Sequence, residues 1–110
     1  MNSTVRSVLT ACLMVGTASV AVTTGAWAAD AAAGKALFAT KCKGCHGADG
    51  TPPASMAKMM NVKPMNDPSV QGKTDAALKT SILKGLNKMP PQKVSDSDAD
   101  NLVAAARTMK

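Results

Sequence analysis

The sequence predicts an all-α fold in one small domain. Segments with helical spacing of apolar residues follow residues that commonly cap helices, and no β-type alternation of useful length appears. The 110 residues show no internal repeat and no sign of a second domain. Only 2% of the residues are aromatic, so the side chains alone give such a short chain little material for a core.

The first half of the domain is expected to hold one clear helix and one short one. Asp30 can cap a helix from about Ala31 to Lys41, and residues 55–60 can form one or two helical turns. Residues 61–72 contain two prolines and are expected to form a loop. Helical structure after the first helix is expected to be broken by three glycines, Gly44, Gly47 and Gly50.

The second half is expected to hold two capped helices. Thr74 can cap a helix from Asp75 to about Lys84, which a glycine then ends. Ser95 can cap a last helix from Asp96 to about Met109. The loop between these helices carries two consecutive prolines and should therefore be stiff.

Two cysteines and a histidine form the most specific motif of the chain. Cys42 and Cys45 are three residues apart, and His46 follows at once. This Cys-x-x-Cys-His spacing is the covalent attachment motif of a c-type haem. On a helical turn the three side chains share one face, so each thiol can add to a haem vinyl group and His46 can bind the iron. The motif predicts one haem c with its iron.

Zinc and redox chemistry are the alternatives for this motif. A zinc site would need further cysteine or histidine ligands, and the sequence after His46 has none. A redox-active dithiol would be expected next to a β-strand, and no strand pattern precedes Cys42.

Residues 1–28 are expected to be a secretory signal peptide, which leaves residues 29–110 as the domain expected to carry the haem. Arg6 precedes an apolar run over residues 8–22, and Ala26-Trp27-Ala28 provides a cleavage site after Ala28. The run is short and diluted for a membrane span, although an uncleaved anchor stays an alternative. Cys12 would leave with the signal peptide. Export to the periplasm fits the place where bacteria attach haem c.

The chain is basic, with thirteen basic and seven acidic residues and a net charge of +6, which falls from +6 to +5 when Arg6 is removed. Lysines flank the segments expected to hold the haem. This charge can serve solubility, or it can steer docking onto an acidic redox protein such as a reductase, dehydrogenase or oxidase. Nucleic-acid binding is not expected, because no aromatic residues alternate with the basic ones. The flanking lysines are Lys41, Lys43, Lys58, Lys63, Lys84, Lys88 and Lys93.

Met89 is the expected second axial ligand of the iron. It stands directly before two prolines that restrict the backbone and remove two amide donors. A methionine opposite a histidine raises the reduction potential of haem iron. Met65 is the runner-up, in the middle loop. The second ring nitrogen of His46 should donate to a carbonyl near the prolines at 52 and 53, or to water. The other methionines are expected to pack around the haem or in the core: Met56, Met59, Met60 and Met109.

With these residues the chain resembles the small class I c-type cytochromes, which are bacterial monohaem electron carriers. The similarity covers residues 34–38, the haem motif, residues 82–90 with the Met-Pro loop, and residues 102–109. It implies a class I cytochrome c fold, in which the terminal helices cross and the protein wraps around one covalently bound haem. In that family a glycine of the first helix packs on an aromatic residue of the last. Gly34 matches the glycine, but Ala105 stands in place of the aromatic residue, so the crossing is either looser or filled by Phe38 and Met109.

The expected function is therefore that of a soluble, monomeric periplasmic electron carrier, not an enzyme. One alternative is a cytochrome subunit of a larger periplasmic redox complex. Another is a haem protein with an open sixth site, but His46 is the only histidine of the chain and no distal catalytic group is visible. Since a buried haem would supply most of the core, the haem-free chain is expected to be largely unfolded.

Overall fold

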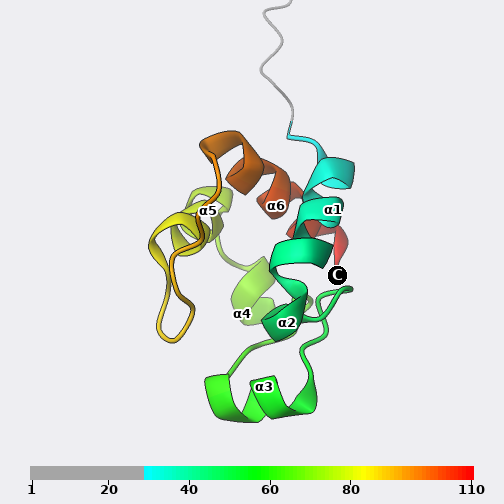
Figure 1. Cartoon of the computed structure of the whole chain (residues 1–110), viewed down its shortest axis with the longest axis vertical. Coiled ribbons are helices and arrows are strands. Elements are labelled where there is room, and N and C mark those ends of the chain that lie inside the picture. Colours follow the sequence, from blue (N-terminus) through cyan, green and yellow to red (C-terminus); the bar gives the residue numbers. More distant parts are fainter. Residues whose placement is uncertain (1–28) are drawn as a thin grey trace, which may run out of the picture.

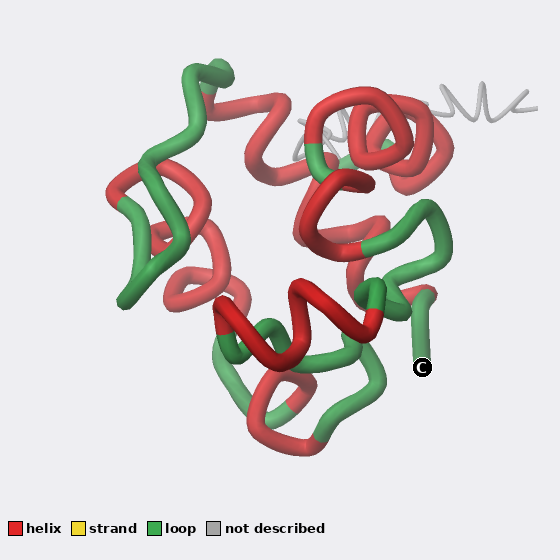
Figure 2. Tube along the Cα trace, turned by 60° about the horizontal axis from the view of Figure 1, so that its bottom comes forward, coloured by secondary structure: helices red, strands yellow, loops and turns green. Residues whose placement is uncertain are grey.

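Helices joined by loops make up the part of the chain that the computed structural model describes, residues 29–110 (Figures 1 and 2). No β-strand occurs in these residues, so the predicted all-α fold is confirmed. The predicted signal peptide and Cys12 lie outside the described residues. Within residues 29–110 every helix is too short or too polar to traverse a lipid bilayer. The helices are α1 (Ala31–Lys41), α2 (Lys43–His46), α3 (Ala54–Met60), α4 (Pro68–Gln71), α5 (Asp75–Lys84) and α6 (Asp96–Thr108).

The three longest helices begin at the residues predicted to cap them. The side chains of Asp30, Thr74 and Ser95 each accept a hydrogen bond from a main-chain amide of the following first turn, at 2.9 to 3.1 Å. These bonds satisfy amides that lack a partner within the helix. Helices α1, α5 and α6 therefore start where local sequence places them.

The prediction of a continuous loop over residues 61–72 is wrong, because the loop contains α4. The Asp67 carboxylate accepts from the Ser69 amide at 2.8 Å and so caps this single turn. Pro68 occupies the first helical position, where a missing amide costs no hydrogen bond. An Asp-Pro pair that favours a loop elsewhere thus starts a helix here.

The glycines around the haem motif behave differently from one another. Gly44 lies inside α2 and breaks no helix; the chain turns instead at Gly47, where φ is +74°. A positive φ is open to glycine at little cost, which explains why the turn falls there. The predicted end of the last helix near Met109 is confirmed, since α6 stops at Thr108 and Met109 follows as its cap residue.

The core lies where α1 crosses α6 (Figure 1). The space between the two helices at Gly34 is very small, since a Cβ built there would fall 1.9 Å from the carbonyl oxygen of Asn101 and 3.0 Å from the Cβ of Ala105. The side chain of Asn101 also accepts from the Asp30 amide at 2.7 Å, which ties the start of α1 to α6. The buried apolar side chains all belong to these two helices: Phe38, Ala99, Leu102, Val103, Ala105 and Ala106.

Helices α1 and α6 therefore cross closely, and not loosely, beside Ala105. Its side chain is completely buried, and Phe38 is 4% exposed. Met109 does not fill this crossing. It is half-buried, and its sulfur lies beside Gly50, next to the side chain of Met65. The helices approach so closely because a glycine faces an alanine and a main-chain carbonyl.

Arg107 joins α6 to the segment that carries α4 and the start of α5. Its guanidinium donates to the Gln71 carbonyl at 2.8 Å, to the Lys73 carbonyl and to the Asp75 carboxylate at 2.9 Å. The Gln71 side-chain amide in turn donates to the carbonyls of Met65 and Ala106, at 2.7 and 3.0 Å. This network fixes the middle of the chain against the last helix.

Candidate functional site

The haem motif lies on one helical turn. The amides of Cys45 and His46 donate to the Cys42 carbonyl at 3.3 and 2.9 Å, which closes the turn. Residues three and four positions apart on a helix share a face. Cys42, at the start of α2, and Cys45 and His46 within it therefore have the register that the sequence predicts.

The two cysteines are free thiols in different surroundings. Cys42 is half-buried and Cys45 is exposed. Burial raises the pKa of the Cys42 thiol; the charge of Lys41 opposes this rise, and Cys45 adds to it. A reactive dithiol has a lowered pKa on its attacking cysteine. Cys42 lacks this feature, because its raised pKa keeps the thiol protonated at neutral pH.

The imidazole of His46 is half-buried and neutral at pH 7. Burial lowers the pKa of this ring, because desolvation disfavours its charged form. The ring of Phe38, from α1, lies against it with the two centroids 5.9 Å apart and the planes at 43°. Helix α1 therefore helps to orient the histidine that α2 supplies.

The expected hydrogen bond from His46 to the loop at residues 52 and 53 is not present in the structure. The Nδ1 atom of His46 is buried and has no hydrogen-bond partner among the described residues. The carbonyl of Thr51, just before these prolines, lies against Gly47. A position with a Cβ would clash there, so Gly47 allows the loop to fold back onto α2.

These residues fit a covalently attached haem. Two thiols one turn apart suit two vinyl groups, and a neutral imidazole is the form that binds a metal. The buried Nδ1 atom of His46 has no hydrogen-bond partner among the described residues, which is unusual in a folded protein. This indicates that His46 also interacts with something other than the polypeptide. Many apolar side chains outside the α1–α6 crossing are only half-buried, as expected of residues that pack on a large flat ligand: Met56, Met60, Leu78, Ile82, Leu83 and Met89.

Met89 lies on a tight turn in the segment between α5 and α6, which Figure 1 draws in yellow and orange. Leu86 and Met89 exchange two main-chain hydrogen bonds, at 3.0 and 2.9 Å. Asn87 occupies the left-handed region, with φ at +52°, which asparagine tolerates better than most residues. Gly85 also has a positive φ, and a Cβ there would come within 2.7 Å of the Met89 carbonyl oxygen.

The turn is also tied to its flanking helix. The Gln92 amide donates to the Ile82 carbonyl of α5 at 2.8 Å, and the Gln92 side chain donates to the Pro90 carbonyl at 2.8 Å. The sequence pointed to the prolines as the source of stiffness. It did not reveal the part of Gln92, because both partners of that residue depend on how the turn folds back on α5.

Met65, the alternative ligand, lies in a different environment. Its amide donates to the Gly50 carbonyl at 2.9 Å, and its side chain lies over Gly50 beside the sulfur of Met109. Met65 thus packs between the loop after α2 and the end of α6. Met59 of α3 is 69% exposed, unlike its half-buried neighbours Met56 and Met60.

All seven lysines that the sequence placed around the site are exposed. Lys88 alone among them donates a side-chain hydrogen bond within residues 29–110, to the Met59 carbonyl at 2.9 Å. The others extend from α1, α2, α3, α5 and the neighbouring loops without such a bond. This exposure fits both solubility and docking.

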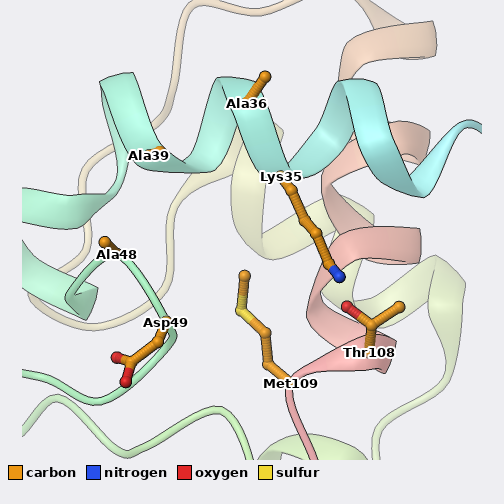
Figure 3. A pocket seen from close by; sticks show the side chains of 7 residues that line it. All are labelled: Lys35, Ala36, Ala39, Ala48, Asp49, Thr108 and Met109. Atoms are coloured by element: carbon orange, nitrogen blue, oxygen red, sulfur yellow. The ribbon is translucent and has the colours of Figure 1, made fainter.

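A hollow on another part of the surface is not part of this site. It lies between α1, the loop after α2 and the end of α6, and Figure 3 shows the side chain of Met109 pointing into it. Cys42, Cys45, His46 and Met89 do not line this hollow. The lining residues are Lys35, Ala36, Ala39, Ala48, Asp49, Thr108 and Met109.

Comparisons with known proteins agree with the haem motif. The family model described as cytochrome c oxidase, cbb3-type, subunit III matches residues 29–104. The solved structure of the KustC0563 c-type cytochrome is similar, with a TM-score of 0.62 and 26% sequence identity over 70% of this chain and 96% of that one. A search of curated proteins found no match to the sequence.

Proposed function

Because the chain belongs to the c-type cytochrome family described as cytochrome c oxidase, cbb3-type, subunit III, we propose that it is a periplasmic one-electron carrier. A c-type cytochrome implies covalently bound haem with iron, and proteins of this kind generally carry electrons. The finer proposal is a single haem with histidine and methionine ligation. The main support is the α2 turn, where two free thiols and a neutral, half-buried imidazole share one face.

Four residues would hold the haem. Cys42 and Cys45 would form the two thioether bonds, and His46 and Met89 would bind the iron from opposite sides. Bound haem iron supplies the one-electron couple, and a thioether ligand raises its reduction potential. The polypeptide keeps the ligands in place: Phe38 lies against His46, and the hydrogen-bonded turn between Leu86 and Met89 limits rearrangement between charge states.

The electron partners would be redox proteins with acidic surfaces. The exposed lysines around α2, α3 and the Met89 turn support this proposal, since opposite charges speed diffusional encounter. Electron exchange with a small anionic iron complex should then slow as salt is added, while exchange with a cationic complex should not. A rate with the anionic complex that does not change with salt would argue for the solubility role alone.

A second candidate follows from the description of the family, which names an oxidase subunit. In that case the chain would work as the cytochrome subunit of a larger redox complex. Affinity purification of the chain from its native membranes and periplasm separates the two cases. A monomer in the periplasmic fraction supports the carrier, whereas constant co-purification with an oxidase or dehydrogenase supports the subunit.

Spectroscopy of the exported holoprotein tests the proposed haem. Haem should stay with the polypeptide through acid–acetone extraction, and the ferric protein should show a low-spin spectrum with the weak long-wavelength band of sulfur-to-iron charge transfer. Met89→Ala should remove this band, because it deletes the proposed ligand. Met65→Ala is the matched control and should retain the band, since Met65 packs over Gly50. Release of the pigment by acid–acetone would sink the proposal.

A further inference from the structure

A hydrogen bond links the Met89 turn to α3. The ammonium group of Lys88 donates to the main-chain carbonyl of Met59 at 2.9 Å, across 29 positions of sequence. Met59 is the next-to-last residue of α3, which ends at Met60. Carbonyls in the last turn of a helix lack partners within it and carry partial negative charge, so a lysine is a favourable donor there.

This bond is the one hydrogen bond between the Met89 turn and α3 within residues 29–110. Helix α3 has none of the extensive helix–helix contacts seen between α1 and α6 or α5 and α6. The Met59 side chain is 69% exposed and therefore adds little packing. Lys84 and Lys93, on either side of the turn, donate no side-chain hydrogen bond within residues 29–110. Lys88 is thus distinguished from its neighbours by its partner and not by its charge.

The restraint on Lys88 passes directly to Met89. The two residues are adjacent, and the turn that contains them is closed by both main-chain bonds between Leu86 and Met89. Moving Met89 away would carry the rigid turn with it and break the bond to α3. The exposed position of both partners keeps this bond modest in strength, so it would affect the rate of opening more than the fold.

We propose that Lys88 is a positioning residue: its hydrogen bond to the Met59 carbonyl holds the turn closed and slows the release of Met89 from the iron. This inference rests on the proposed ligation by Met89. It assigns to one lysine of the surface a role that its neighbours do not share.

Displacement of Met89 by added imidazole, measured on the ferric holoprotein, tests this role of the hydrogen bond between Lys88 and Met59, which we call the latch. Imidazole can bind only after the turn opens, so the rate at which the sulfur-to-iron band disappears reports opening. Lys88→Ala should accelerate this loss about three- to tenfold. Lys88→Arg keeps a donor and should restore much of the slow rate. The resting spectrum should keep its band in every variant.

Two matched variants separate the latch from simpler effects. Lys93→Ala removes the same charge from an exposed position near the turn and should leave the rate unchanged. Met59→Ala keeps the carbonyl and should also behave as the parent protein. Equal acceleration by Lys88→Ala and Lys93→Ala, or no acceleration by either, overturns the latch. If the unmodified holoprotein shows no sulfur-to-iron band, the ligation by Met89 itself fails, and the latch fails with it.

Discussion

Gly34 of α1 lies directly against the main-chain carbonyl of Asn101 in α6, and the contact leaves no room for a side chain. A Cβ at position 34 would lie 1.9 Å from that carbonyl oxygen and 3.0 Å from the Cβ of Ala105. Main-chain atoms in the middle of a helix cannot move aside as the tip of a flexible side chain can. The distance between the two terminal helices is therefore set by the absence of a side chain on one of them.

Replacement of this glycine should destabilise the protein. Gly34→Ala forces α1 and α6 apart and should lower the free energy of unfolding by about 2 kcal/mol or more. Chemical denaturation of the holoprotein, followed by circular dichroism, measures the change. Gly44→Ala is the control, since a Cβ at Gly44 meets nothing within 4 Å and should change stability by less than about 1 kcal/mol. Equal losses in both variants would show that the crossing is not the cause.

Loss of the Arg107 guanidinium should loosen the middle of the chain. Arg107→Ala leaves the carbonyls of Gln71 and Lys73 without their donor, and the expected loss is about 1–3 kcal/mol of stability. The pair with Asp75 should add little, because that carboxylate is 75% exposed. Lys73→Ala is the control: it removes a nearby charge but keeps the carbonyl that Arg107 uses. Urea unfolding of both variants distinguishes lost hydrogen bonds from lost charge.

The titration of Asp67 should depend on Ser69. The Ser69 hydroxyl donates to the Asp67 carboxylate at 2.6 Å and is the main reason why the pKa of Asp67 is lowered; the Ser69 amide adds to the effect. Since the folded-state pKa is depressed, the cap on α4 is complete at neutral pH and is lost only as the pH falls through that pKa, below the ordinary value of an aspartate. Ser69→Ala should raise the pKa of Asp67, as measured by carbon NMR of its carboxyl group. Ser55→Ala, which changes a distant hydroxyl, should leave it as it was.

Removal of Cys42 and Cys45, the proposed attachment residues, should unfold most of the domain. In the described part of the chain the buried apolar side chains are confined to α1 and α6, so the remaining helices are expected to depend on the haem for most of their packing. The Cys42→Ala/Cys45→Ala double variant should therefore lose most of the helical signal in circular dichroism. Helix content equal to that of the holoprotein, in the absence of haem, would contradict this dependence.

Local signals in the sequence were sufficient for most helix starts. Asp30, Thr74 and Ser95 act on amides only two or three residues away, so their capping role is visible without the fold. The sequence does not predict α4, although Asp67 has the same capping role, because a proline favours a loop as readily as the first turn of a helix. The prediction that Gly44 breaks the helix is wrong, because the surroundings of a glycine decide whether it adopts a helical conformation.

Contacts between distant segments could not be predicted in the same way. The haem motif is a matter of spacing, and its turn on α2 follows from that spacing alone. The partners of Arg107 and Lys88 are 29 to 36 positions away, and nothing near either residue indicates a main-chain carbonyl as the partner. The choice between a loose and a close crossing at Ala105 likewise required the three-dimensional position of Asn101.

The crossing of α1 and α6 joins the two ends of the domain, so the domain can form only after α6 is available. Among residues 29–110, every buried side chain other than Phe38 belongs to α6. A chain that still lacks α6 therefore has almost no apolar side chain to bury. Until α6 is in place, the cysteine turn stays on a loose, accessible polypeptide, which favours chemistry on its thiols before the fold closes around them.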